Sequence, residues 1–420
     1  KLVAAGNTLG GILVAGTVTN TVIGGAPTGD PDKPVFTLVS GNTGPGIVIG
    51  DDTTNSQVLN NIIGFAKDGT TAMPNGLTEL FVGPGSTGNT IDGNTIACFL
   101  AGTMIAAEHG EVAVEDLRKG MRVRTASGGL RTVAWIGQRR IDCRRHPNPH
   151  LTWPVRILPG AFGEGMPARD LYLSADHAVA MDGVLIPVRH LVNGRTVLRE
   201  MRDEVHYFHV ELDAHDVLLA EGLPCESFLD TGNRSDFENG GTVVTLHPVP
   251  AMQVWHDKAC LPLVQEGAHV EAARSVLLER AAAMGFTTTQ EAAVHLVADG
   301  VVIEPVVDGR HHRFHVPAGV KAVRLVSRSA VPAEVHAGSE DKRRMGVAVS
   351  GVWVDGTRLA LTDQRLAGGW HAAERLPGGA AWRWTEGRAV IVLPPGTGAR
   401  VLDVAVRLTE RYWRDERKAG

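Results

Sequence analysis

The stretch CFLAGTMIAAEHGEVAVEDLRKGMRV, residues 98–123, begins with an isolated cysteine and decides the fold of the middle of the chain. Small residues follow Cys98, and a turn is expected at His109-Gly110. On both sides of this turn, apolar and polar residues alternate. A period of two is typical of half-buried β-strands, so the stretch predicts short strands joined by a tight turn.

Two further blocks follow this opening. The second is LYLSADHAVAMDG, residues 171–183, which contains Ser174 and His177 in a Ser-x-x-His spacing. The third is EVHYFHVELDAHDVLLAEGLPCES, residues 204–227. A Ser-x-x-His spacing on its own is weak evidence for a catalytic site, but here it stands between two other motifs.

The three blocks, in this order, resemble the Hint superfamily, which is shared by inteins, hedgehog autoprocessing domains and bacterial intein-like proteins. The order and separation of three distinct motifs make the resemblance specific. It implies a compact all-β domain over residues 98–230. It also implies that this domain cleaves its own chain at the Ala97–Cys98 bond.

The resemblance assigns a role to each motif residue. The thiol of Cys98 attacks the carbonyl of Ala97 in an N–S acyl shift that turns the amide into a thioester, because a thiolate is a strong nucleophile and a good leaving group. His177 protonates the departing nitrogen or polarises the amide. Ser174, where threonine is commoner in the family, holds the carbonyl or the ring. His215 falls at the position of a third-block histidine, although packing would explain it equally well.

The end of the unit departs from inteins. Glu226 and Ser227 stand where inteins have His-Asn, so no asparagine is present to cyclise and cut a second junction. Full splicing is therefore not expected. Water or another small nucleophile would resolve the thioester, as in hedgehog domains. Cys225 would receive the acyl group from Cys98, form a disulfide with it, or remain an inert thiol.

Two carboxylates flank the second motif. Asp170 and Asp176 are candidates to orient or activate His177 or Cys98. Carboxylates near catalytic groups are common, so these two assignments depend on where the fold puts the side chains.

Residues 1–97 are rich in Gly, Asn and Thr and nearly free of charge. Segments such as GNTLGGILV (6–14) and GNTGPGIVIG (41–50) repeat a Gly/Asn/Thr corner followed by a β-branched run. Gly and Asn tolerate the left-handed φ that corners need, and stacked apolar runs build a continuous core. The pattern favours a parallel β-helix fragment, which would be the passenger that is cut off. The alternative is an unstructured Gly/Asn-rich linker.

Residues 250–420 combine one helical pattern with many strand patterns. Apolar residues at a spacing of three to four predict a helix at about 255–282. Short strands punctuated by Asp-Gly and Pro-Gly turns follow and predict a β-sandwich-like domain. One set of residues in this domain would form either an aromatic face for glycans or a buried aromatic core. The set is Trp370, Trp382, Trp384 and Glu374.

Composition excludes several classes of protein. The formal net charge of −5 gives no electrostatic reason to expect nucleic acid as a partner. No segment of 18 or more apolar residues is present, so no membrane span is expected. The 4 cysteines are widely separated and match neither a metal-ligand spacing nor a disulfide framework. No cofactor and no metal are expected, and metal binding by His146 and His150 is the less favoured alternative to a plain loop.

These patterns predict a mainly β protein of three parts, residues 1–97, 98–230 and 250–420. The central part would cleave itself once from its passenger, so the chain is its own substrate. Solenoids of this kind are common in surface and secreted bacterial proteins, which predicts a secreted or cell-surface location. The chain begins at Lys1 rather than Met, which suggests a fragment whose export signal lay upstream. The alternative is a non-catalytic surface adhesion or glycan-binding protein with an inactive Hint fold.

Overall fold

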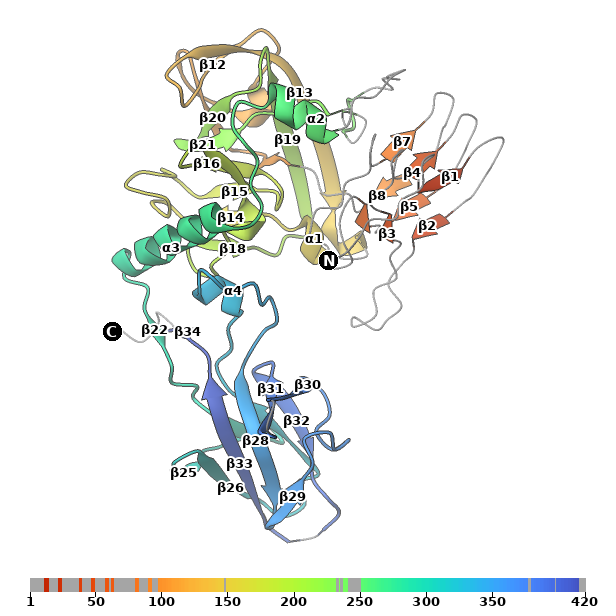
Figure 1. Cartoon of the computed structure of the whole chain (residues 1–420), viewed down its shortest axis with the longest axis vertical. Coiled ribbons are helices and arrows are strands. Elements are labelled where there is room, and N and C mark those ends of the chain that lie inside the picture. The colour runs from red at the N-terminus through yellow and green to blue at the C-terminus, as the bar shows by residue number, and fades with distance from the viewer. Residues whose placement is uncertain are drawn as a thin grey trace. The chain divides into compact units, whose positions relative to one another are not determined.

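The structure is a computed structural model of the chain, and the predicted fold class, mainly β, is confirmed. The chain divides into two compact units, Lys1–Val192 with Thr196–Ala273, and Asn193–Arg195 with Arg274–Gly420. Figure 1 shows the elements of both units. The structure describes residues 11–14, 22–24, 38–39, 47–49, 57–59, 62–63, 80–82, 90–92, 97–146, 149–231, 234, 237–240, 251–376, 379–396 and 398–414.

The described residues before Ala97 are short strands that pair in parallel (Figure 1). Ile12 pairs with Ile47, and Ile47 pairs with Leu80, so strands far apart in sequence stack in register. The turns between them lie outside the described residues, so the β-helix stays a prediction. The strands form three sheets: β1 (Ile12–Val14), β4 (Ile47–Ile49) and β7 (Leu80–Val82); β2 (Val22–Gly24), β5 (Gln57–Leu59) and β8 (Thr90–Asp92); β3 (Leu38–Val39) and β6 (Ile62–Ile63).

The chain after Ala97 forms an antiparallel sheet in which 13 strands are described, in the order β17-β16-β21-β20-β10-β12-β13-β19-β9-β15-β14-β18, with β11 beside β10. The turn expected at His109-Gly110 is confirmed, because β10 and β11 form a hairpin there. The strands are β9 (Phe99–Leu100), β10 (Met104–Ala107), β11 (Gly110–Ala113), β12 (Arg122–Arg124), β13 (Leu130–Asp142), β14 (Val155–Ile157), β15 (Leu171–Leu173), β16 (Ala178–Met181), β17 (Val184–Pro187), β18 (Val197–Arg199), β19 (Glu204–Leu212), β20 (Val217–Ala220) and β21 (Leu223–Glu226). Short helical turns connect them: η1 (Val114–Asp116), η2 (Cys143–Arg145), α1 (Pro149–Thr152) and η3 (Val188–His190).

Strand β9 directly follows the predicted cleavage point and lies between β15 and β19. Phe99 pairs with Leu173 of β15 and with Phe208 of β19, and its side chain is fully buried. Burial of a phenylalanine side chain stabilises a fold by roughly 1.5–3 kcal/mol. The chain that follows the predicted cleavage point is therefore held between the end of β15 and the middle of β19.

The prediction of a single helix at about 255–282 is wrong in the middle of that range. Two helices form instead, α2 (Ala251–Lys258) and α3 (Ala268–Ala283). Between them the chain is extended beside β17, because the N–H of Leu185 donates to the carbonyl of Pro262 and the N–H of Val264 donates to the carbonyl of Leu185, both at 2.8 Å. Pro262 has no N–H to give to a helix, and this pairing uses its carbonyl in a sheet-like contact.

The C-terminal unit contains two larger antiparallel sheets within its described residues (Figure 1). One has the order β24-β23-β27-β32, and the other has the order β25-β26-β33-β28-β31-β30 with β29 beside β28. The elements are β22 (Thr288–Thr289), β23 (His295–Ala298), β24 (Val301–Ile303), β25 (Val306–Asp308), β26 (His311–Val316), β27 (Ala322–Val326), α4 (Pro332–Val335), β28 (Val347–Val354), β29 (Thr357–Leu359), β30 (Trp370–Arg375), β31 (Ala381–Thr385), β32 (Arg388–Val392), β33 (Arg400–Thr409) and β34 (Tyr412–Trp413), the last paired with β22.

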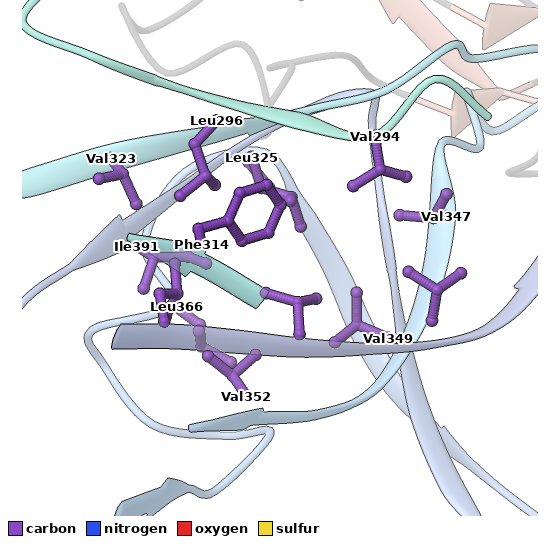
Figure 2. Close-up of a cluster of buried hydrophobic side chains, with 14 of the residues drawn as sticks. Val294, Leu296, Phe314, Val323, Leu325, Val347, Val349, Val352, Leu366 and Ile391 are labelled. Carbon is purple, nitrogen blue, oxygen red and sulfur yellow. The ribbon is translucent and has the colours of Figure 1, made fainter. Parts of the chain in front are cut away.

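One apolar core joins these two sheets. Figure 2 shows Phe314 of one sheet beside Leu325 and Leu296 of the other, and all three side chains are buried. The expected sandwich stays a prediction in its details. No helix in the described parts of the chain combines the length and apolarity that a bilayer crossing needs.

Candidate functional site

Ser174 contacts the peptide at the predicted cleavage point directly. The N–H of Cys98 donates to the Ser174 Oγ at 2.7 Å, and the N–H of Ser174 donates to the carbonyl of Cys98 at 2.9 Å. Both bonds follow from strand pairing. Leu173 pairs with Phe99 in an antiparallel arrangement, so the next residue, Ser174, lies opposite Cys98. The sequence analysis expected Ser174 to hold the carbonyl or the ring. Its hydroxyl lies at the amide nitrogen, and a role at the carbonyl or the ring stays a prediction.

His177 reaches the same place through a tight turn. Its N–H donates to the carbonyl of Ser174 at 3.1 Å, and its ring packs at 4.2 Å from the ring of Phe99, centroid to centroid. Burial lowers its pKa well below 6.5, the charge of His209 lowers it further, and the backbone of Glu226 opposes both. Neither ring nitrogen completes a hydrogen bond within the part of the chain that the structure describes.

His209, on β19, is the site residue that the sequence analysis missed. Phe208 faces Phe99 in an antiparallel pair, so continuing that register places His209 opposite Cys98. Its ring lies 5.0 Å from that of His177. Burial lowers its pKa to about 3, and the charge of His215 lowers it further, whereas the backbones of Ala97 and Ser227 oppose this shift. The third block contains His209, but only strand register distinguishes it from His215.

Glu226 brings a buried carboxyl group to the end of β21. Its Oε1 accepts a hydrogen bond at 2.7 Å from the N–H of Ala178, the residue after His177. Burial raises its pKa to about 8, so the group is mainly protonated at neutral pH. The next residue, Ser227, is fully buried, and its Oγ accepts a hydrogen bond from the N–H of Asp216 at 3.0 Å.

His215 lies in the loop between β19 and β20. Its Nδ1 accepts a hydrogen bond from the N–H of Cys260 at 3.0 Å, and its ring packs edge-on against Trp255. Burial lowers its pKa to about 4, and the backbone of Ser227 opposes this shift. The charge of His215 also lowers the pKa of His209. The catalytic role of His215 stays a prediction.

Cys225 is fully buried within β21, where it pairs with Val179 of β16. Burial, followed by the charge of Glu226, raises its pKa well above 9.0. The thiol form therefore dominates at neutral pH, which disfavours nucleophilic attack by this residue. Its roles as an acyl acceptor or disulfide partner stay predictions.

The two carboxylates that flank the second motif are engaged in ion pairs. Asp170 pairs with Arg156 at 2.7 Å, and Asp176 pairs with Arg189. Both carboxylates thus have cationic partners of their own. In the described ranges, no group of three or more His, Cys, Asp or Glu side chains is arranged to hold a metal ion.

The Cys98 side chain is only 1% exposed and belongs to an apolar cluster. Trp135 is partly buried against this cluster, with its ring 5.3 Å from the rings of both Phe228 and Phe237. The N–H of Glu238 donates to β13, which holds the chain after Phe237 against the domain. Water therefore has little access to the thiol. The cluster consists of Cys98, Cys143, Val205, Tyr207, Phe228 and Phe237.

The arrangement can perform acyl transfer in a dry, neutral environment. His177, His209 and Glu226 are each uncharged at pH 7 for the same reason, burial. Hydrogen bonds to a developing charge are stronger in such a low-dielectric site than in water. A cysteine, a hydroxyl and two imidazoles gather at the start of β9.

Comparison with known proteins identifies the central part of the chain. Residues 97–232 match the model of the Hint domain family and form a Hint domain. No curated protein matches the chain. A bacterial intein-like domain from Clostridium thermocellum is similar in structure at 17% identity, with 32% of this chain and 99% of that chain covered and a TM-score of 0.24. The gp41-1 intein is similar at 12% identity, with 31% and 98% covered and a TM-score of 0.24. A DnaB intein from Synechocystis sp. PCC 6803 is similar at 10% identity, with 32% and 99% covered and a TM-score of 0.22.

Proposed function

We propose that the Hint domain of residues 97–232 cleaves its own chain once, at the Ala97–Cys98 bond. The reaction is an N–S acyl shift followed by release of the thioester to water or another small nucleophile. The observation that carries the proposal is the 2.7 Å contact between the amide nitrogen of Cys98 and the Ser174 hydroxyl. It supports cleavage because the leaving atom of the reaction is this nitrogen.

In the first step the Cys98 sulfur attacks the carbonyl carbon of Ala97. A carbon–sulfur bond forms, the carbon–nitrogen bond breaks, and the proton lost by the thiol ends on the nitrogen. Ser174 would pass or hold that proton, and the neutral His177 would accept it from the thiol as a general base and return it to the leaving nitrogen as a general acid. A planar amide resists such attack, so the groups around the peptide must stabilise the intermediate.

In the second step a nucleophile attacks the thioester carbon, and the sulfur of Cys98 leaves. Water yields a free carboxylate at Ala97, and an amine or alcohol would become attached to it instead. Glu226 and Ser227 offer no side-chain amide for cyclisation. The chain after Cys98 therefore keeps its link to the C-terminal unit.

Intact mass of the purified chain tests the proposal. The protein is incubated with and without dithiothreitol or hydroxylamine beside a Cys98→Ala control, which removes only the sulfur. We expect a fragment ending at Ala97 that increases with the added nucleophile and is absent in the control. If wild type and control both stay whole under reducing conditions, the cleavage proposal is wrong and the non-catalytic adhesion alternative takes its place.

A further inference from the structure

We propose that His209 is a second catalytic histidine, whose ring N–H faces the carbonyl oxygen of Ala97 and donates to it as negative charge develops there. This inference rests on the proposed cleavage and deepens it. In this scheme Ser174 and His177 act at the amide nitrogen of Cys98, and His209 acts at the carbonyl oxygen of Ala97.

Strand register brings His209 to the scissile peptide. Phe99 and Leu100 pair with Phe208 and Tyr207, and the same register places Cys98 opposite His209. Side chains directly opposite each other in an antiparallel pair lie on the same face, with Cβ atoms about 5 Å apart. The backbone of Ala97 lies close enough to the ring to raise its pKa against the effect of burial, as a nearby carbonyl oxygen does.

The hydrogen bonding of the His209 ring indicates a donor that is available to the reaction. His209 is 3% exposed, and neither ring nitrogen completes a hydrogen bond within the described ranges. Buried polar groups in folded proteins are almost always paired, and an unpaired one costs about 1–3 kcal/mol. An oxyanion donor must be aimed at the oxygen of the tetrahedral intermediate rather than at the starting carbonyl. A contact with Ala97 that falls short of a full hydrogen bond fits that requirement.

The His209 ring is also fixed by its neighbours and is neutral. It packs between His177, at 5.0 Å, and Phe228, at 5.2 Å, with Phe99 at its edge. A neutral imidazole carries one N–H donor, and this ring is neutral at the pH at which the chain would react. It therefore stabilises an oxyanion without adding a charge beside His177.

Rates of nucleophile-induced cleavage in three variants test the role. His209→Leu removes the donor, His209→Gln keeps an N–H donor on a side chain of similar length, and His206→Leu is the matched control. His206 lies on the same strand, but its ring packs on Phe208. Loss of one oxyanion donor typically lowers a rate by about 100- to 1000-fold. We expect a loss of that order in His209→Leu, a rate within about tenfold of wild type in His209→Gln, and an unchanged rate in the control.

Each outcome decides one of the two proposals. If wild type shows no thioester-dependent cleavage, the proposed function fails. If wild type cleaves and folded His209→Leu cleaves equally fast, the function stands and the role of His209 is wrong. Equal losses in folded His209→Gln and His209→Leu also overturn the donor role. His209→Phe keeps a ring but no donor and replaces His209→Leu if that variant does not fold.

The carbonyl of Ala97 can also be observed directly. The sequence contains two Ala-Cys pairs, Ala97–Cys98 and Ala259–Cys260. Labelling alanine carbonyls with ¹³C and cysteine nitrogens with ¹⁵N therefore gives two selectable NMR signals, and the second is an internal reference. We expect donor-free variants at His209 to move the Ala97 carbonyl signal upfield while that of Ala259 stays in place. An unmoved Ala97 signal in a folded variant would contradict the proposal.

Discussion

The surroundings of Cys98 and the core of the C-terminal unit are buried to a similar degree but differ in content. The core shown in Figure 2 is built from Val, Leu, Ile and Phe side chains, with Phe314 fully buried among them. Around Cys98, by contrast, His177, His209 and Glu226 are buried as well. Polar groups without full hydrogen bonding destabilise a fold. The comparison therefore indicates that one region is built for stability and the other retains groups for chemistry.

Replacing His177 should have the largest effect on the cleavage rate and would show most clearly how the two regions differ. We expect His177→Leu to lower the cleavage rate by about 100- to 10,000-fold, the usual contribution of general acid–base catalysis. Stability should stay the same or rise, because the variant removes a buried polar ring with unpaired nitrogens. Mass spectrometry measures the rate, and urea unfolding measures the stability. Cleavage at the wild-type rate in the folded variant would refute the assignment.

The opposite result is expected for the C-terminal core. Phe314→Ala should destabilise its unit by about 3–5 kcal/mol, since it leaves a cavity among well-packed side chains. Cleavage at Ala97–Cys98 should be unchanged well below the unfolding temperature. Val302→Ala is the control, because Val302 is 54% exposed and its truncation should barely alter stability. Thermal unfolding and the mass assay, run together, check both parts, and slower cleavage in Phe314→Ala would show that the regions are coupled.

Glu226 should give a smaller, pH-dependent effect. In the unfolded chain the carboxyl titrates near its ordinary pKa of 4.5, whereas burial raises the folded value to about 8. As pH rises through that interval only the unfolded state loses its proton, so this group lowers stability progressively up to about pH 8. Glu226→Gln cannot titrate and keeps an oxygen for the N–H of Ala178. Its stability relative to wild type should be nearly constant below pH 4.5 and should rise by about 1 kcal/mol per pH unit above that.

Unfolding free energies of wild type and Glu226→Gln from pH 4 to pH 9 provide the measurement. Using the difference between the two proteins removes the contribution of the buried histidines, whose lowered pKa values destabilise both below about pH 6.5. A difference that does not change with pH would mean that the pKa of the folded carboxyl is not raised above its value in the unfolded chain.

The Hint domain could be predicted from sequence because its motifs are local. Cys98, Ser174 and His177 stand in short blocks, and the tight turn after Ser174 sets the place of His177. His209 could not be distinguished from His215 in this way, because its position depends on the register between two strands that are far apart in the chain. The sequence singled out Glu226 only because it stands where inteins have a histidine.

The remaining differences from expectation also come from tertiary contacts. Pro262 lies in an extended segment because β17 offers it a partner, although the flanking sequence favours helix. Trp135 looks like a surface residue in an alternating strand, but Phe228 and Phe237 return from later in the chain to cover it. In both cases a distant segment overrides the local pattern.

The placement of β9 between β15 and β19 has a consequence for what can be cut. The contacts described here at the scissile peptide come from residues within the Hint domain, and Ala97 is the one residue on the released side among them. If the proposed cleavage is correct, we expect the domain to act on an attachment point without depending on the cargo. We expect it to be a transferable cutting module, which would release any protein fused in front of Ala97 as readily as the strands that precede it here.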